Sequence, residues 1–348
     1  MLCDIHNHLG KGMTAEQVSE YYLKLKETNG IDRNCIMSIP VSPSAAVYHT
    51  QNLLSLQVKD ILMPYSSAFM GLVHGEGAED YLTQLKKGLE MGFEGLKILE
   101  SHPSLELELD FRMNDMQFDA MFRYAEENGI PVLMHVADPE ESWDINTVDQ
   151  YALTHGRFYG AEGRKSKEEY YSEIDDILAR HPNLKVIFAH FYFLSADIDR
   201  ATLMFEKYPN VCFDLTPGKE MYENFGKDLD KTRAFFERFS DRLYYGTDVN
   251  DTPAINYHSS LYTLVSTALD SSEPFVWGKY NCAGLGLSCE AKEKIMSENF
   301  IKLLGDTPKP LNYEAIREEI ARLQSVSDIF SDKDKEQLKA AKEYFADK

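Results

Sequence analysis

Short apolar runs and segments of helical periodicity alternate along the whole chain. The apolar runs predict eight strands, at Leu2–His8, Cys35–Val41, Phe69–His74, Gly95–Leu99, Pro131–Ala137, Lys185–Tyr192, Val211–Leu215 and Leu243–Val249. The helical segments lie at Ala15–Thr28, Gln51–Val58, Ala78–Met91, Met116–Asn128, Glu168–Arg180, Asp197–Lys207, Asp230–Phe239 and Ala291–Leu304. This alternation is typical of a parallel sheet with crossover helices. Because eight such units match the number that closes a barrel, the pattern predicts an α/β fold of the (β/α)8 TIM barrel type.

The third unit is interrupted by a proline. Pro64 lies within the apolar run Ile61–Tyr65. Since proline has no amide hydrogen to donate to a central ladder, we place the strand after it.

The pattern changes after Gly305, where two prolines break the chain. Two further amphipathic segments follow, at Tyr313–Leu323 and Lys333–Tyr344. The sequence therefore predicts a barrel over residues 1–305 and a C-terminal helical tail, packed on the barrel, over residues 306–348.

Two connections are longer than ordinary loops. The segment Asp138–Lys167 follows the fifth predicted strand and contains Trp143 and Tyr159. Loops on that side of a barrel form the rim of the active site, so this segment is a candidate substrate lid. The other long connection, Asn250–Ser288, contains a helical stretch at Tyr257–Leu269.

Composition narrows the class of partner. The chain has 57 acidic and 36 basic residues, a formal net charge of −21, which repels nucleic acid and anionic membranes. Its five cysteines are scattered, which predicts free thiols in a reducing compartment. Without a signal segment or a long apolar stretch, the sequence predicts a cytoplasmic protein. A small-molecule substrate and a symmetric homodimer are the expected partners.

Polar side chains gather where the predicted strands end. His6 and His8 are two positions apart in the first strand, so their imidazoles lie on one face. His135, His190 and Asp248 each end a later apolar run. Because the strands of a parallel barrel end at one rim, we expect these five side chains to meet there. Imidazoles with one carboxylate are typical ligands of a catalytic metal ion.

Three other residues lie close to the same rim. Asp4 shares the face of His6 and is expected to orient it. His74 ends the third predicted strand and His102 follows the fourth, so contact with substrate and a packing role are both open for them.

These motifs resemble the amidohydrolase superfamily, in particular its amidohydrolase 2 branch. The resemblance is carried by Asp4-Ile-His-Asn-His8, Gly246-Thr-Asp248 and the histidines at positions 135 and 190. The stretches Gly92–Ile98 and Glu298–Gly305 also resemble family sequences, so the resemblance spans nearly the whole chain.

The resemblance implies a ligand set. His6, His8, His135 and Asp248 would bind one divalent metal ion, and His190 would contact the water or the substrate. Zinc suits imidazoles with one carboxylate, and manganese or iron(II) can substitute.

Lys97 lies in the fourth predicted strand. In two-metal members of the superfamily a carboxylated lysine at the end of this strand bridges the ions. In the amidohydrolase 2 branch a lysine there commonly accompanies one metal, so we interpret Lys97 as a substrate-binding or structural residue.

The leading prediction is a metal-dependent hydrolase that attacks the carbonyl group of an amide, lactone or ester. Asp248 would move the proton of the water, and His190 would hold the water or the oxyanion. An alternative implied by the resemblance is non-oxidative decarboxylation of a carboxylated aromatic or muconate-type substrate, with Arg157 or Arg164 binding the carboxylate. Hydratase chemistry is a further alternative. A non-catalytic metal-binding barrel ranks last, since no ligand is missing.

Overall fold

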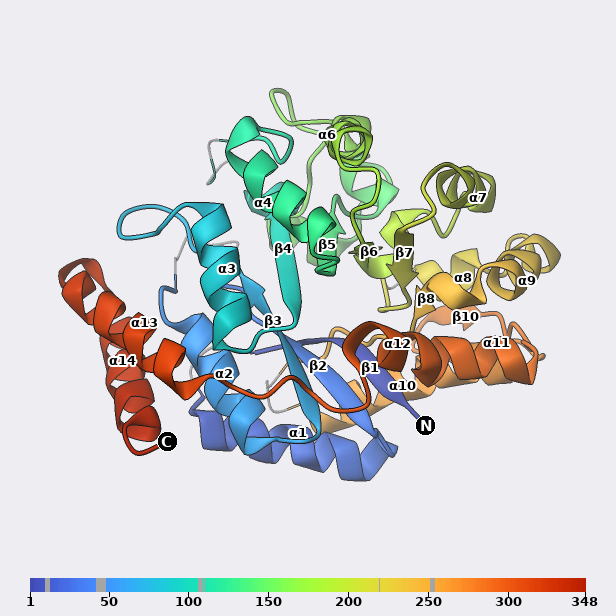
Figure 1. The fold of residues 1–348 in the computed structure, drawn as a ribbon. Coiled ribbons are helices and arrows are strands. Elements are labelled where there is room, and N and C mark those ends of the chain that lie inside the picture. Colours follow the sequence, from blue (N-terminus) through green and yellow to red (C-terminus); the bar gives the residue numbers. More distant parts are fainter. Residues whose placement is uncertain (10–12, 42–47, 106–108, 110, 219, 251–253) are drawn as a thin grey trace.

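The computed structural model describes residues 1–9, 13–41, 48–105, 109, 111–218, 220–250 and 254–348. Within them, eight parallel strands form one sheet in the order of the sequence (Figure 1). The strands are β1 (Cys3–His8), β2 (Arg33–Met37), β3 (Ser66–Gly71), β4 (Gly95–Ser101), β5 (Val132–Val136), β6 (Val186–Phe188), β7 (Val211–Asp214) and β8 (Leu243–Tyr244). Helices surround them, and the fold is the predicted (β/α)8 barrel.

Long helices connect the strands, and shorter elements decorate the later units. The connecting helices are α1 (Ala15–Asn29), α2 (Gln51–Ile61), α3 (Tyr81–Met91), α4 (Met116–Glu127), α6 (Lys167–Arg180), α7 (Ile198–Lys207) and α9 (Leu229–Arg238). The additional elements are α5 (Gln150–Thr154), α8 (Met221–Asn224), α10 (Ile255–Asp270), β9 (Phe275–Trp277), β10 (Tyr280–Cys282), α11 (Cys289–Glu293) and α12 (Asn299–Leu304). A π-helical turn, Lys294–Glu298, joins α11 to α12.

Backbone hydrogen bonds close the barrel between its last and first strands. β8 is shorter than predicted because the amide of Tyr245 donates to the carbonyl of Ile295 in the π-helical turn (3.0 Å). The chain beyond it still pairs with β1. The amide of Asp248 donates to the carbonyl of His6 (2.9 Å), and the amide of His8 donates to the carbonyl of Val249 (2.7 Å). Closure therefore sets Asp248 beside the two histidines of β1.

Other strands also end at different residues from those predicted: β2 ends at Met37 rather than Val41, and β4 ends at Ser101 rather than Leu99. β3 starts at Ser66, after the proline as expected but before the predicted Phe69, since Ser66 and Ser67 are fully buried. A buried serine that donates to a carboxylate, as Ser67 does to Glu94 (3.0 Å), is indistinguishable in sequence from a loop residue. β6 ends at Phe188 instead of continuing to position 192, because the backbone after it turns left-handed.

Apolar side chains fill the barrel interior, and α12 closes its amino-terminal end. The interior cluster consists of Cys3, Ile5, Cys35, Met37, Phe69, Leu133, Ile187, Ala189, Tyr244 and Phe300. Phe300 comes from α12, and the guanidinium of Arg33 lies 5.4 Å from the centre of its ring. All five cysteines are free, as predicted. No helix in the described part of the chain has the length and apolar content to cross a bilayer.

The predicted C-terminal helical extension is present as α13 (Tyr313–Ser325) and α14 (Asp332–Phe345), beside α2 and α3 (Figure 1). Asp334 accepts hydrogen bonds from the amide (3.1 Å) and hydroxyl (2.8 Å) of Thr50. Asp60 accepts from the hydroxyl groups of Tyr313 (2.7 Å) and Tyr344 (2.8 Å). These bonds fix the extension to the helical ring.

A buried ion pair at the amino-terminal end of the barrel joins several elements. Lys59 Nζ lies 2.6 Å from Glu94 Oε2, and the exposed fractions of the two side chains are 0% and 7%. Glu94 Oε1 also accepts hydrogen bonds from the hydroxyl of Ser67 and the amide of Lys309, each at 3.0 Å.

Replacing Lys59 with methionine should lower the free energy of unfolding by about 3–5 kcal/mol, because the Glu94 carboxylate would stay buried without its partner. Urea denaturation of the variant measures this loss. The double variant Lys59→Met/Glu94→Leu should regain part of the stability, since no buried charge remains. A single variant as stable as the parent chain would show that the pair does not stabilise the barrel.

Candidate metal centre

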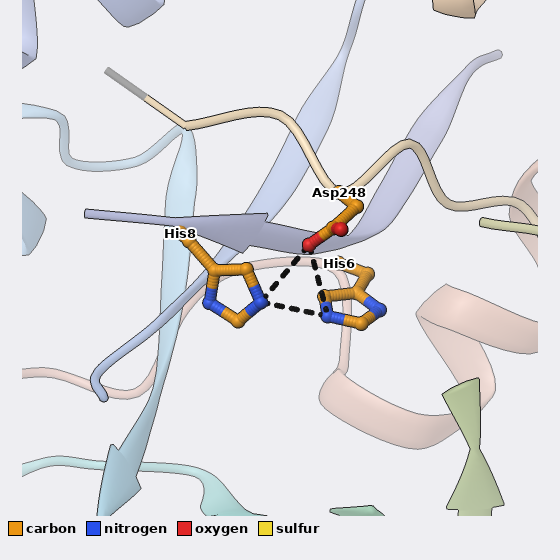
Figure 2. Close-up of side chains that lie close together, drawn as sticks. All are labelled: His6, His8 and Asp248. Atoms are coloured by element: carbon orange, nitrogen blue, oxygen red, sulfur yellow. Dashed lines mark hydrogen bonds and ion pairs between the residues drawn. The ribbon is translucent and has the colours of Figure 1, made fainter. Parts of the chain in front are cut away.

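Three of the predicted site residues meet at the carboxyl-terminal mouth of the barrel (Figure 2). His6 Nε2 lies 2.9 Å from His8 Nε2, and Asp248 Oδ1 lies 3.1 Å from His8 Nε2 and 3.6 Å from His6 Nε2. His6 is fully buried, whereas 41% of the Asp248 side chain is exposed at the mouth. The three side chains therefore converge on one point that solvent or a substrate reaches from above.

The second nitrogen of each imidazole is fixed by a hydrogen bond. His6 Nδ1 lies 2.7 Å from Asp214 Oδ2, and His8 Nδ1 lies 3.3 Å from the carbonyl oxygen of Met37. Because these oxygens accept, the Nδ1 atoms carry the protons of the neutral rings, and the lone pairs lie on the two facing Nε2 atoms. Metal-binding histidines characteristically donate their other N–H to a carboxylate or a carbonyl group. The donor set fits a divalent metal ion.

The protonation states of His6 and Asp248 suit the same ion. Burial, together with the neighbouring Lys97 and His8, holds the pKa of His6 well below its usual value, so the ring is neutral. Burial raises the pKa of Asp248, but the contact with His8 (3.1 Å) and the proximity of His6 and His190 outweigh it and leave that pKa well below normal. Neutral imidazoles and an ionised carboxylate are the forms that bind a divalent ion.

Asp214, at the end of β7, holds His6 and the chain around His190 in place through hydrogen bonds. Its Oδ2 faces His6, and its Oδ1 accepts hydrogen bonds from the amides of His190 (2.8 Å) and Thr216 (3.1 Å). Asp214 is not among the site residues predicted from the sequence. The signal was present, since Asp214 ends the apolar run of the seventh strand as His135 ends that of the fifth.

Asp4, expected to orient His6, binds the backbone of the first strand, and the ring of His6 is oriented by Asp214 instead. Asp4 Oδ1 accepts a hydrogen bond from the amide of His6 (3.0 Å), and Oδ2 accepts one from the hydroxyl of Thr247 (2.5 Å). Gly246, just before Thr247, leaves no space for a side chain. An added Cβ there would lie 2.6 Å from Thr216 Oγ1 and 3.2 Å from His6 Cβ. Close packing around His6 therefore requires a glycine at position 246.

His190 lies beside the centre in an unusual backbone conformation. Residues His190, Phe191, Tyr192 and Phe193 have φ values of 56°, 55°, 55° and 50°, the left-handed region that non-glycine residues rarely adopt. The ring of His190 lies 5.8 Å from that of His6, and its Nδ1 lies 3.2 Å from the carbonyl oxygen of Thr216. His190 Nε2 is consequently the nitrogen with a free lone pair.

His135 is not part of the group formed by His6, His8 and Asp248. Its ring lies 4.8 Å from that of His190, but its Nε2 faces the carbonyl oxygen of Ala137 at 2.9 Å. Ala137 also has a left-handed backbone, with φ 62°, which turns its carbonyl group back toward the ring. His135 therefore lies next to the centre, but its Nε2 faces the backbone of Ala137.

Lys97 projects from β4 to the centre. Its Nζ lies 3.0 Å from His6 Nε2, and its side chain is 2% exposed. Burial lowers the pKa of Lys97 to about 8, although Asp248 and Asp214 act in the opposite direction. The amino group of Lys97 is therefore buried next to the three converging side chains of His6, His8 and Asp248.

The long segment after β5, the candidate lid, is held together by contacts between its own residues. The hydroxyl of Tyr159 donates to Asp138 Oδ2 (2.7 Å), and Trp143 Nε1 donates to the carbonyl of Lys165 (2.9 Å). The rings of Trp143 and Tyr159 lie 5.1 Å apart. Both aromatic residues named from the sequence thus pack within the segment.

Of the two histidines left open, only His102 adjoins the centre. Its ring lies 4.6 Å from that of His135. His74 instead pairs with Glu100 (2.8 Å) and contacts the ring of Phe111.

The barrel and the imidazole–carboxylate group at its mouth define the class of protein, a (β/α)8-barrel enzyme with a candidate metal centre. The chain belongs to the amidohydrolase family of the amidohydrolase 2 type, whose family model matches residues 45–305. This match confirms the resemblance drawn from the sequence motifs. Among curated proteins, none matches the chain.

Solved structures share the fold. 2,6-Dihydroxybenzoate decarboxylase from Rhizobium aligns with a TM-score of 0.57 at 13% identity, over 87% of this chain and 98% of that one. 4-Oxalomesaconate hydratase from Rhodopseudomonas palustris aligns with a TM-score of 0.54 at 14% identity, over 94% and 100%. Dihydroxybenzoic acid decarboxylase from Polaromonas, with bound manganese, aligns with a TM-score of 0.53 at 12% identity, over 87% and 96%. At these identities the likeness shows the fold alone.

Proposed function

We propose that the chain is a metal-dependent hydrolase that uses an activated water to attack the carbonyl group of a small amide, lactone or ester. The observation that carries the proposal is the convergence of His6 Nε2, His8 Nε2 and Asp248 Oδ1 within 3.6 Å of one another. The second nitrogen of each imidazole is already occupied as a donor, the arrangement that catalytic metal ligands adopt.

In this proposal His6, His8, His135 and Asp248 hold one divalent ion, with zinc preferred and manganese or iron(II) as substitutes. His135 would join the others through Nδ1, since its Nε2 donates its proton to the carbonyl oxygen of Ala137. When bound, such an ion acidifies a water molecule and polarises a substrate carbonyl.

The chain's own residues handle the protons. The ionised, half-exposed carboxylate of Asp248 is placed to take the proton of the water and pass it to the leaving group. His190 offers a lone pair at Nε2, so it holds the water by accepting one of its hydrogens. Lys97, buried beside His6, is the cation placed to face a negative oxygen of the substrate.

Non-oxidative decarboxylation is the alternative, and the position of Lys97 favours it. A buried ammonium 3.0 Å from His6 Nε2 would bind a substrate carboxylate next to the metal. Of the two arginines considered for that role, Arg164 already donates to the carbonyl of Pro103 and lies over the ring of Tyr159, and Arg157 is exposed. Two decarboxylases of dihydroxybenzoates share this fold, and the Polaromonas structure contains manganese and 2-nitroresorcinol.

Elemental analysis of the purified chain, followed by assays on lactones, amides and aromatic acids with detection of carbon dioxide, tests the proposal. We expect one divalent ion per chain and hydrolysis without release of carbon dioxide. Release of carbon dioxide would assign the decarboxylase activity instead. Two ions per chain, reduced to one in Lys97→Met, would identify Lys97 as a carboxylated bridge. A chain that binds no metal would refute the proposed centre.

A further inference from the structure

A second group of polar side chains lies beside the centre, where β4 and β5 end. The ligand-type atoms of His102, His135 and Asp138 lie within 4.8 Å of one another, and all three residues are buried. The ring of His135 lies 4.6 Å from that of His102 and 4.8 Å from that of His190. The group therefore adjoins the centre, and by distance alone it resembles a second metal site.

Hydrogen bonds place protons where a metal ion would need lone pairs. The amide of Ser104 donates to His102 Nδ1 (3.1 Å), so the neutral ring of His102 carries its proton on Nε2. The carbonyl of Ala137 accepts from His135 Nε2 (2.9 Å), so that nitrogen is protonated as well. Both nitrogens that face Asp138 are N–H donors, and we exclude a metal ion between them.

The carboxylate of Asp138 and the N–H of His102 do not satisfy each other. Asp138 Oδ2 accepts the hydroxyl of Tyr159 at 2.7 Å, but it lies 3.6 Å from His102 Nε2. Asp138 Oδ1 lies 3.8 Å from His135 Nε2. Both distances exceed a hydrogen bond. Within the described part of the chain, no acceptor lies within hydrogen-bond distance of His102 Nε2, and no donor within that distance of Asp138 Oδ1.

An unused donor beside an unused acceptor, both on buried residues, selects for a particular chemical group. Polar groups in such positions are almost always hydrogen-bonded in native proteins, so a water molecule or a substrate group from outside the chain would complete this pair. A hydroxyl group matches both, since its oxygen accepts from His102 and its hydrogen is donated to Asp138. An ether oxygen accepts but cannot donate. A carboxylate is repelled by Asp138.

We propose that His102 and Asp138 form a subsite that binds a hydroxyl group of the substrate. The inference rests on the proposed function, because it places this group next to the reacting carbonyl or carboxyl group. The ring of Phe193 stacks on His190 (centroids 5.1 Å apart, interplanar angle 24°) and lies 5.5 Å from the ring of His135. An aromatic ring that contacts both His190, beside the centre, and His135, beside the subsite, favours a hydroxylated aromatic compound.

Binding of paired ligands to the zinc-loaded chain tests the subsite. The probes are 2-, 3- and 4-hydroxybenzoate, the methyl ether of each, and isophthalate, measured by isothermal titration calorimetry. At least one hydroxybenzoate should bind about 10–100-fold more tightly than its own methyl ether, because a hydrogen bond to a charged group usually contributes about this much to binding affinity.

Two variants should separate the donor and the acceptor of the subsite. His102→Phe keeps a ring but removes the N–H that a hydroxyl and an ether oxygen both accept, so both members of each pair should bind less tightly while Asp138 maintains a preference for the hydroxyl. Asp138→Asn keeps the shape but removes the charge, and its amide can donate to an ether oxygen, so the preference should fall toward one and isophthalate should bind more tightly than to the parent chain. The matched control is Glu100→Gln, which changes another buried carboxylate paired with a histidine, His74 (2.8 Å), and should keep the preference.

The outcomes separate this inference from the proposed function. Equal binding within every pair, no binding of any hydroxybenzoate, a preference that Asp138→Asn leaves undiminished, or binding of both members of each pair that His102→Phe leaves unchanged would overturn the subsite. The zinc content of the same samples is measured in parallel. A chain that loads zinc without a hydroxyl preference refutes only the subsite, whereas a chain that loads no zinc refutes the centre itself.

Discussion

Replacing Asp248 with asparagine should reduce kcat by about 10²–10⁴-fold, the usual contribution of a positioned proton-transfer group, with a much smaller change in KM. Asparagine keeps the shape of the side chain and an oxygen toward His8, but it cannot accept the proton of the attacking water. Steady-state kinetics on the substrate identified by the screen measure the loss. The zinc content of the variant shows whether the ligand role and the proton-transfer role of Asp248 separate.

The control for this experiment is Asp270→Asn at the surface. Asp270 pairs with Lys292 at 2.8 Å, and 57% of its side chain is exposed. Its loss should leave kcat unchanged, because exposed pairs contribute little even to stability. A fully active Asp248→Asn enzyme would eliminate the proposed proton transfer.

Removal of the metal with a chelator should abolish turnover and lower the melting temperature, and added zinc should restore both. A bound cation would stabilise the facing Nε2 atoms of His6 and His8, which lie only 2.9 Å apart, and the neighbouring Asp248 carboxylate. A ligand present at about 1,000 times its Kd stabilises the folded state by about 4 kcal/mol. Differential scanning fluorimetry and activity assays of the same samples measure both effects.

The variant His6→Ala is the control for metal removal. Without one converging imidazole, its melting temperature should respond little to the chelator or to zinc. Should the chelated parent chain keep full activity, or should His6→Ala respond to zinc as strongly as the parent does, the centre would lie elsewhere.

The sequence predicted the features of the centre that follow from strand geometry alone. His6 and His8 share a face because side chains alternate along a strand, and Asp248 reaches them because parallel strands end at one rim. The same rule applied to the seventh strand would have found Asp214, whose polar side chain ends an apolar run.

Features that depend on backbone conformation or on distant hydrogen bonds were beyond sequence reasoning. The direction of His135 Nε2 follows from the left-handed backbone of Ala137, which no pattern of apolar residues indicates. The early end of β8 depends on one carbonyl group of a π-helical turn about 50 residues later. The tautomer of His102 is set by the amide of Ser104, which the sequence alone does not orient.

The left-handed run from His190 to Phe193 makes the centre sensitive to the packing beneath it. Each L-residue in this conformation costs roughly 1–2 kcal/mol, so four in succession oppose folding by roughly 4–8 kcal/mol. The run persists because its neighbours hold it: the ring of Phe191 lies parallel to that of Phe236 in α9, with centroids 5.7 Å apart. Substitutions in α9, which contacts neither a predicted metal ligand nor the substrate, would therefore lower activity by releasing the imidazole of His190. A survey of impaired variants would find them in the aromatic packing around Phe191 and Phe236 as well as at the mouth of the barrel.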